Sequence, residues 1–179
     1  DILINNAANN PKISKKKFSN LKNFNIKDWN ADIEVGLTGS LNCAIVFGHI
    51  MADNNKGVIL NISSDLSTIA PDQRLYNDNK EYSIVKPISY SVVKTGLIGM
   101  TKYLSTYWHH KNIRVNALSP GGVYNNHDKK FYNKIKKLIP LNRMASIDEY
   151  KGAIQFLCTD ASSYMTGQNI VIDGGRSVW

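Results

Sequence analysis

Four short apolar runs, separated by three longer stretches of helical character, constrain the fold of this chain more than any other feature. The apolar runs cover residues 1–4, 58–62, 113–118 and 168–172. The stretches with a helical spacing of apolar residues cover 26–53, 87–111 and 146–158. Strands that alternate with helices form parallel sheets covered by helices on both faces. The sequence therefore predicts a doubly wound parallel α/β sheet in a single domain.

The predicted helices carry recognisable terminal signals. Asn25 is placed to cap the helix 26–53, which the glycine at Gly36 weakens locally. Ser146 and Glu149 form a capping box at the start of the last predicted helix. A basic segment between 127 and 138 is also expected to be helical and mobile.

Tyr90 and Lys94 lie four residues apart in the predicted helix 87–111, so they share one face of it. A free phenol has a pKa of about 10, and a fixed ammonium nearby lowers that pKa because it favours the phenolate. Such a pair could act as a general acid or base near neutral pH. The alternative is an exposed tyrosine and lysine without a chemical role, since this spacing often arises by chance.

Small and polar residues follow every predicted strand. These strand ends are Asn5-Asn6-Ala7, Ser63-Ser64, Pro120-Gly121-Gly122 and Asp173-Gly174-Gly175. Ligands of parallel sheets bind beyond the carboxyl ends of the strands. We expect the first three ends to converge near the start of the helix that carries Tyr90, which predicts a binding site. The hydroxyl of Ser64 could instead simply cap a backbone group.

The long polar segment 65–86 connects Ser64 to the helix that carries Tyr90. A connection of this length in a compact domain often has a function. We expect it to arch beside the site, where its tyrosine, asparagine and aspartate side chains suit a sugar-like ligand. A solvated excursion without substrate contacts is the alternative.

The formal net charge of +8 does not indicate a nucleic-acid partner. Its basic groups, Lys15-Lys16-Lys17 and the lysines between 129 and 137, come with neither an aromatic ladder nor zinc-ligand spacing. No apolar run approaches the roughly 18 residues that a membrane helix needs. Cys43 and Cys158 are far apart, which is typical of reduced thiols in a cytosolic protein. We therefore expect a cytoplasmic protein without nucleic-acid partner, membrane segment or metal.

In combination, the motifs resemble those of the short-chain dehydrogenase/reductase family over essentially the whole chain. The strand end after 1–4 resembles that family's Asn-Asn-Ala-Gly turn, and Ser64 matches its catalytic serine. Tyr90 and Lys94 match its catalytic pair. The segment 114–121 resembles the strand and turn that touch the nicotinamide, and 167–175 resembles the C-terminal strand.

This resemblance implies a Rossmann-like sheet and an oxidoreductase that uses NAD or NADP to interconvert a hydroxyl and a keto group. Tyr90 would transfer the proton, Lys94 would lower the tyrosine pKa and hold the nicotinamide ribose, and Ser64 would bind the substrate oxygen. The residues implied in cofactor binding are Asn5, Ala7, Ile62, Tyr90, Lys94, Pro120, Gly121 and Val123. Relatives commonly pair two of their helices, which implies a homodimer or homotetramer. In this chain the helices 26–53 and 87–111 carry apolar residues beyond one stripe, which we expect at such a contact surface: Val46, Phe47, Ile98, Tyr103 and Trp108.

A narrower resemblance is to family members associated with bacterial surface sugars and flagellin modification, including the flagellin modification protein A type. It rests on Ala70-Pro71-Asp72, Lys86-Pro87 and the turn that begins at Pro120. It implies a polar, sugar-like small-molecule substrate and a place in polysaccharide biosynthesis.

Three departures from the family pattern stand out. Gly36 occupies the position where the family usually has an asparagine that supports a proton-relay water. Asn125 stands where a threonine usually contacts the carboxamide. No Gly-x-x-x-Gly-x-Gly motif occurs in these 179 residues, although pyrophosphate binding depends on such a loop. We therefore expect that an N-terminal, glycine-rich half precedes Asp1, and that the chain as given binds NAD(P) weakly.

Our interpretation is the catalytic part of a nicotinamide-dependent oxidoreductase. Two alternatives remain: an inactive half-domain that only folds or dimerises, and a sugar-nucleotide-binding protein without catalysis. The sequence leaves open the substrate, the reaction direction and the choice between NAD and NADP, because that choice depends on residues after a strand that this sequence does not contain.

Overall fold

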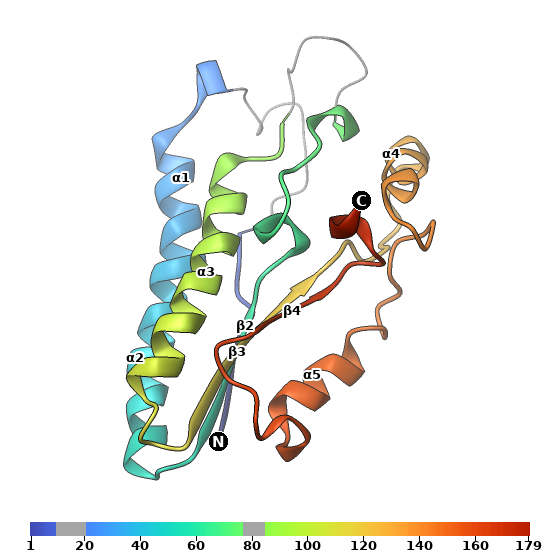
Figure 1. Cartoon of the computed structure of the whole chain (residues 1–179). Helices are drawn as coiled ribbons and strands as arrows, with labels where there is room; N and C mark the ends of the chain where they lie inside the picture. Colours follow the sequence, from blue (N-terminus) through green and yellow to red (C-terminus); the bar gives the residue numbers. More distant parts are fainter. Residues whose placement is uncertain (10–20, 77–84) are drawn as a thin grey trace.

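The computed structural model describes residues 1–9, 21–76 and 85–179. The expectations for Lys15-Lys16-Lys17 and for the central part of the segment 65–86 fall outside these residues. Four strands form one parallel sheet in the order β1-β2-β3-β4 (Figure 1). Their bounds are Ile2–Asn5, Gly57–Ile62, Ile113–Pro120 and Asn169–Ile172. The predicted parallel sheet is confirmed, with each strand end within two residues of its expected position.

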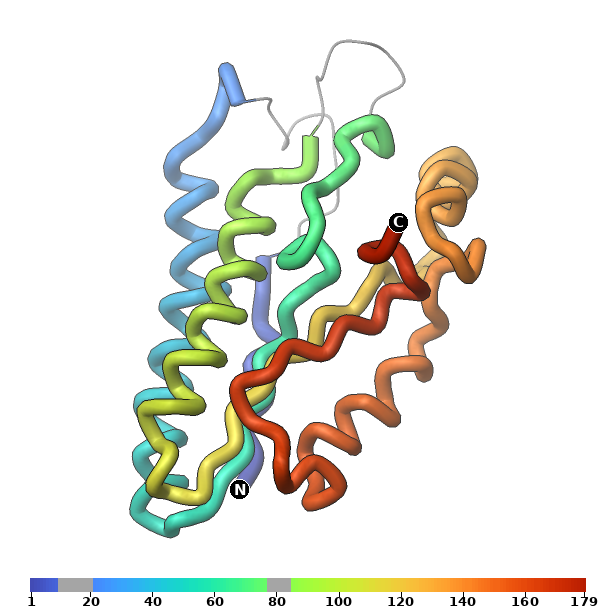
Figure 2. The backbone as a smooth tube through the Cα atoms, viewed as in Figure 1, coloured from blue at the N-terminus to red at the C-terminus, as the bar shows by residue number. Residues whose placement is uncertain are grey.

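Helices cover both faces of the sheet, as the doubly wound prediction requires (Figure 2). On one face lie α1 (Ile26–Ile33), α2 (Gly39–Asp53) and α3 (Ile88–Tyr107), and on the other lies α5 (Lys151–Cys158). The expected helix near 127–138 is present as α4 (Lys129–Ile135), which continues in a short 3-10 turn.

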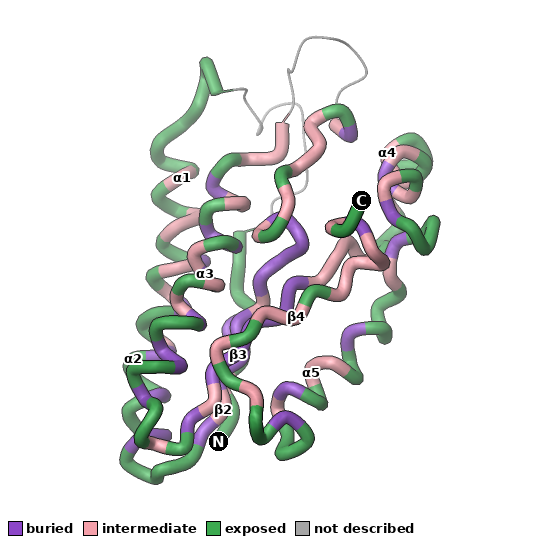
Figure 3. The backbone as a smooth tube through the Cα atoms, in the orientation of Figure 1, coloured by how far each residue is buried: buried purple, intermediate pink, exposed green. Residues whose placement is uncertain are grey.

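Side chains of the central strands β2 and β3 point alternately to the two faces of the sheet and form an apolar layer on each. Ile59 and Val115 face a cluster with α2 and α3, whereas Leu60 and Leu118 face Leu157 of α5 on the other side. Side chains alternate between the two faces of a strand, so consecutive apolar residues are all buried when helices cover both faces. Figure 3 shows this burial along β2 and β3. The strand ends are thereby held at one edge of a rigid sheet.

The predicted helix 26–53 is continuous but contains a π-helical turn at Glu34–Thr38. Its N-cap is confirmed, because the Asn25 side chain accepts a hydrogen bond from the backbone N–H of Lys27 at 3.0 Å. Within the π turn, a Cβ atom on Gly36 would lie 2.4 Å from Cγ1 of Val93 in α3. The glycine therefore permits close contact between the two helices, which an asparagine at this position would prevent.

The capping box of the last helix forms only in part. The Glu149 carboxylate accepts the backbone N–H of Ser146 at 2.7 Å, as predicted. The helix nevertheless begins at Lys151 rather than at 146. Arg143 binds both oxygens of Glu149 at 2.6 Å, and the Tyr150 hydroxyl donates to the Gly121 carbonyl at 3.0 Å. These contacts hold 146–150 in a turn against the sheet end.

The outer faces of the molecule carry apolar residues. Val46 and Phe47 of α2 and Tyr103 of α3 are exposed, as expected for a contact surface. Trp108, which we expected on that surface, is only 4% exposed and packs across Gly48. The tryptophan belongs to the core because the glycine leaves room for its ring.

By length and composition alone, the stretch Ile26–Asp53 could cross a membrane. This corrects the expectation that no segment approaches the necessary length. One side of the stretch packs on the sheet and α3, so its apolar character has a structural explanation in the core. The expected absence of a membrane segment stays a prediction.

Candidate functional site

The carboxyl ends of β2 and β3 meet the first half of α3, as the sequence predicts. The Ser63 hydroxyl, which follows β2, donates to the Lys94 carbonyl in α3 at 2.7 Å. Ser119 near the end of β3 lies 3.2 Å from Ser67, measured between their hydroxyl oxygens. These contacts bring residues from three segments, separated by up to 56 positions, to one edge of the sheet.

Ser64 follows β2 in extended backbone and is 5% exposed. Its hydroxyl oxygen accepts the backbone N–H of Leu66 at 3.2 Å, which is the capping role foreseen as an alternative. The same hydroxyl donates its proton to Oδ1 of Asp65 at 2.9 Å. Ser64 therefore faces the site with its position fixed on both sides.

Tyr90 lies in the first turn of α3 and is half-buried. Burial raises the pKa of its phenol, a side-chain hydrogen bond with Ser64 opposes that rise, and the charge of Asp65 adds to it. The expected lowering of this pKa by Lys94 is not observed, because burial has the largest effect on the phenol and raises its pKa. The Lys94 ammonium lies 5.8 Å from the centroid of the Tyr90 ring.

Lys94 is 5% exposed and extends behind Tyr90 toward β2. Its Nζ atom donates to the Ile62 carbonyl at 2.8 Å. Burial lowers the pKa of Lys94 to about 8, because an ammonium loses hydration inside the protein. In the described part of the chain, the Ile62 carbonyl is the only hydrogen-bond acceptor of this ammonium. Two of its three N–H donors therefore remain for a bound hydroxyl-bearing ligand.

The residues that the family resemblance implies in cofactor binding differ in their placement. The Asn5 side chain turns into the fold, where it donates to Oδ1 of Asn61 at 2.8 Å. Ala7 is exposed beyond β1. Pro120 ends β3, and Val123 follows it in an isolated bridge with Ala145. These residues lie at the expected edge of the sheet, but the Asn5 amide serves the core.

Gly121 has a structural reason of its own to be glycine. A Cβ atom at this position would lie 2.8 Å from the Cα atom of Asp173 in the neighbouring turn. The Gly121 N–H also donates to the Ile172 carbonyl at 2.8 Å. The close approach of the two strand ends thus accounts for this glycine without a ligand. Asn125, the other departure in this turn, is exposed, and its N–H donates to His127.

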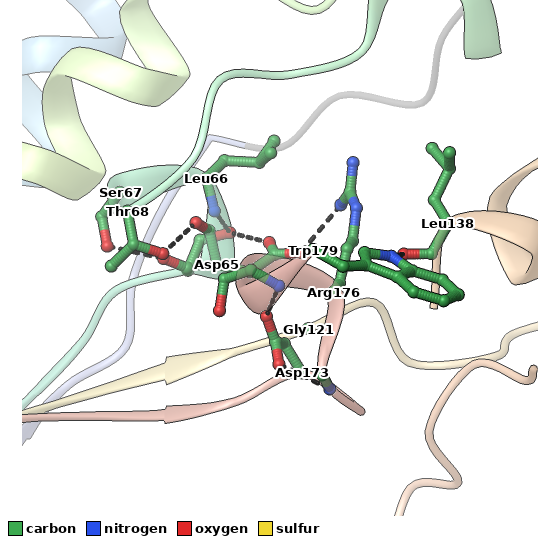
Figure 4. A network of polar contacts seen from close by, with 12 residues as sticks. Asp65, Leu66, Ser67, Thr68, Gly121, Leu138, Asp173, Arg176 and Trp179 are labelled. Carbon is green, nitrogen blue, oxygen red and sulfur yellow. Dashed lines mark hydrogen bonds and ion pairs between the residues drawn. The ribbon is translucent and has the colours of Figure 1, made fainter. Parts of the chain in front are cut away.

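A buried ion pair between Asp65 and Arg176 was not predicted from the sequence. Nη1 of Arg176 lies 2.7 Å from Oδ2 of Asp65, and the side chains are only 8% and 5% exposed (Figure 4). The two residues are 111 positions apart. An arginine after a glycine turn and an aspartate after a serine are individually common, so only the fold shows their contact.

The C-terminal turn places Arg176 at this site. Gly174 and Gly175 adopt positive φ angles of 68° and 88°, which favour glycine. The Asp173 carboxylate accepts the backbone N–H groups of Gly175 at 2.9 Å and Ser177 at 2.7 Å. The sequence Asp173-Gly174-Gly175, expected only to end a strand, therefore also directs the guanidinium toward Asp65.

Lys86 is a second site residue whose position the sequence did not reveal. Its Nζ atom lies 3.7 Å from the centroid of the Tyr90 ring, which is a cation–π distance. Burial lowers the pKa of Lys86 to about 8, and the charge of Asp65 opposes that shift. A backbone N–H of Lys86 also donates to the Gln73 side chain at 2.9 Å. The segment 65–86 therefore contributes a cation to the site, whereas residues 77–84 fall outside the described part of the chain.

The assembled groups are suited to proton transfer at one oxygen atom. A half-buried phenol, a buried serine hydroxyl and two lysine ammonium groups surround the same edge of the sheet. Residues 1–9, 21–76 and 85–179 contain no cluster of His, Cys, Asp or Glu that could hold a metal ion. The expected absence of a metal stays a prediction.

Comparison with protein families gives a match over residues 1–177 to the family described as enoyl-(acyl carrier protein) reductase. The chain is 29% identical to a D-threitol dehydrogenase of Mycolicibacterium smegmatis, over 99% of the chain and 63% of that protein. It is 34% identical to a 3-oxoacyl-(acyl-carrier-protein) reductase of Thermotoga maritima, over 98% of the chain and 65% of that protein.

A solved structure agrees with these sequence matches. A short-chain dehydrogenase of Leptospira borgpetersenii with bound NAD+ superposes with a TM-score of 0.88 at 32% identity. The alignment covers 99% of the chain and 65% of that structure. The chain thus spans somewhat less than two thirds of the length of these proteins.

Proposed function

Since the chain belongs to the short-chain dehydrogenase/reductase family, we propose that it forms the catalytic part of an NAD- or NADP-dependent oxidoreductase. The reaction interconverts a hydroxyl and a keto group on a polar small molecule. The observation that carries this proposal is the meeting of Tyr90, Ser64 and Lys94 at the carboxyl edge of the sheet. The protein acts in the cytoplasm.

Tyr90 is the proton-transfer group in this proposal. Its phenol donates a proton to the substrate oxygen during reduction and accepts one during oxidation. General acid–base groups of this kind contribute about 10² to 10⁴-fold to rate. Ser64, fixed by its contacts with Leu66 and Asp65, positions the substrate oxygen beside the phenol.

Lys94 assists the proton transfer by Tyr90 through its buried ammonium group. Its buried ammonium has donors left over after the Ile62 carbonyl, so it can bind ribose hydroxyls and approach the phenolate as that charge forms. Burial of this charge costs free energy, which lowers the pKa of Lys94 to about 8. A buried ammonium held at a ligand-facing edge is more consistent with a functional role than with stability.

The residues present fit the nicotinamide half of a dinucleotide. Lys94 would hold the ribose, and Pro120, Gly121 and Val123 would line the carboxamide side. The nicotinamide, when bound, supplies the acceptor or donor of the hydride. Asn5 contributes through its backbone at most, because its amide is engaged with Asn61.

We also propose that an upstream segment completes the cofactor site. Ile2 and Ile4 on the edge strand β1 are 51% and 43% exposed. The apolar sequence of β1 is nevertheless typical of a strand buried inside a sheet. A strand edge of this kind can pair with another strand. The chain as given should bind NAD and NADP weakly, since it holds no glycine-rich loop. Titration calorimetry checks this, and micromolar affinity of the 179-residue chain would contradict it.

The substrate is proposed to be a polyol or sugar-like molecule. The D-threitol dehydrogenase relative supports this class, and the polar residues of the segment 65–86 suit several hydroxyl groups. The resemblance to bacterial surface-sugar and flagellin-modification proteins points the same way. Acyl substrates are the second candidate, favoured by the family description and by the Thermotoga maritima relative.

The two rival functions predict no turnover. An inactive half-domain would fold or dimerise only, and a sugar-nucleotide binder would hold its ligand without chemistry. The test is to supply the full-length protein with NAD or NADP and a panel of polyols, aldonic acids and 3-oxoacyl thioesters. Formation or loss of reduced nicotinamide with a polyol supports the proposal. Binding without turnover over the whole panel would contradict it.

A further inference from the structure

The hydrogen bonds around Ser64 limit how many further hydrogen bonds its hydroxyl can donate or accept. A serine hydroxyl has one proton to donate and two lone pairs that accept. The proton goes to Oδ1 of Asp65 at 2.9 Å, and one lone pair takes the N–H of Leu66 at 3.2 Å. With the proton on the Asp65 side, only one lone pair remains for Tyr90 or a substrate. In this state Ser64 can accept a hydrogen bond at the reacting oxygen but cannot donate one. A proton turned toward Tyr90 would instead lower the pKa of the phenol.

Asp65 is held as strongly as Ser64. Its second oxygen accepts Nη1 of Arg176 at 2.7 Å, and its carbonyl accepts the Thr68 hydroxyl at 2.7 Å. The carboxylate is therefore buried between a guanidinium and the Ser64 hydroxyl. A buried carboxylate draws a neighbouring hydroxyl proton toward itself, and a bound guanidinium weakens that attraction by neutralising the charge.

We propose that Asp65 and Arg176 form a positioning pair that holds the Ser64 proton away from Tyr90 and the substrate oxygen in the resting site, with Arg176 setting how firmly it is held. The inference rests on the proposed function of Ser64 and Tyr90. It assigns a role to the C-terminal turn, whose two left-handed glycines and Asp173 carboxylate direct Arg176 into the site.

The proposal predicts opposite effects for the two partners. In Asp65→Asn the negative charge disappears and the Ser64 proton can turn to the Tyr90 oxygen, so the phenolate is favoured. In Arg176→Gln the Asp65 carboxylate loses its guanidinium partner and holds the Ser64 proton more firmly, so the phenolate is disfavoured. Other charged or titratable groups that face Tyr90 stay unchanged in both variants. Among residues 1–9, 21–76 and 85–179, these groups are Tyr76, Lys86 and Lys94.

The experiment is the pH profile of alcohol oxidation by the full-length protein, together with carbon-13 NMR titration of the Tyr90 ring. The midpoints of the pH profile and of the NMR titration should both move to lower pH in Asp65→Asn and to higher pH in Arg176→Gln. Because Arg176 acts through the Asp65 carboxylate, the double variant should keep the midpoint of Asp65→Asn. A return toward the wild-type midpoint would mean that the two charges act on Tyr90 directly, and would overturn the proposal. Asp148→Asn is the control, because it breaks an aspartate–lysine pair whose side chains are 69% and 76% exposed, and it should move neither the kinetic nor the NMR midpoint.

A purely structural ion pair would give a different result. Both single variants would then lose thermal stability while their midpoints stay at the wild-type pH or move together, and this outcome would overturn the proposal. If Arg176→Gln fails to fold, Asp65→Asn alone must still move the midpoint downward, and must do so less in a Ser64→Ala background. The NMR titration needs no turnover, so it tests the pair even where the proposed enzymatic function fails.

Discussion

The ammonium of Lys86 lies 3.7 Å from the centroid of the Tyr90 ring, whereas the ammonium of Lys94 lies 5.8 Å from it. Of these two ammonium groups, that of Lys86 is thus the nearer to the Tyr90 ring. Lys86 precedes α3 and reaches back across the face of the ring. A cation in this position stabilises a developing phenolate through its charge.

Replacing Lys86 should therefore move the pH dependence of alcohol oxidation. In Lys86→Met the phenolate loses a nearby positive charge, so the pKa of Tyr90 rises and the acidic limb moves to higher pH. The effect should be largest below about pH 8, because Lys86 itself becomes neutral above its pKa of about 8. Lys102→Met, at an exposed lysine of the same helix, is the control. An unmoved profile in Lys86→Met would remove Lys86 from the site.

Lys94→Met should stabilise the fold while it abolishes turnover. Burial lowers the pKa of Lys94 to about 8, below the unfolded value of about 10.4. The folded state therefore releases this proton first, and wild-type stability should rise with pH between those two values. The Lys94→Met variant should have a higher Tm at neutral pH. Its stability should rise less than that of the wild type between those two pH values, and Lys86 should account for the rise that remains. Calorimetry over pH measures both, and a lower Tm would argue against a burial penalty at Lys94.

The glycine at position 36 should be required by packing. A Cβ atom there would lie 2.4 Å from Val93, so Gly36→Asn should cost about 1–3 kcal/mol through overpacking. Combining it with Val93→Ala should recover part of that loss. Gly99→Ala in α3 is the matched control, since nothing lies within 4 Å of its Cβ position, and it should be neutral or stabilising. Equal effects of the two glycine substitutions on chemical denaturation would refute this explanation.

Self-association should use the outer face of α2 and α3. Val46, Phe47 and Tyr103 are 56%, 48% and 65% exposed, which is unusual for such large apolar residues on adjacent helices. We expect a homodimer or homotetramer by light scattering at micromolar concentration. Phe47→Asp should dissociate it, whereas Leu141→Asp, at an exposed leucine elsewhere, should not. A wild-type monomer would rule out this surface.

The sheet and its edge were predictable because they depend on local patterns. Apolar runs of strand length identified β2 and β3, and the Tyr90–Lys94 spacing required only that α3 be a helix. Burial at Tyr90 was not predictable, since desolvation depends on which segments cover the ring. The contact of Asp65 with Arg176 likewise depends on a turn far along the chain. At Gly36 the sequence showed a departure from the family, and only the packing against Val93 explains it.

The most direct test of the account is the turnover of Tyr90→Phe in the full-length protein, compared with Tyr107→Phe. Both variants remove one hydroxyl from α3, but Tyr107 is 51% exposed and belongs to the far end of the helix. With a substrate that the wild-type protein oxidises, Tyr90→Phe should lower kcat by at least about 10²-fold at unchanged Tm, because the proton-transfer group is gone. Tyr107→Phe should keep the wild-type rate. Near-normal turnover in Tyr90→Phe would contradict the assignment of Tyr90 as the catalytic group.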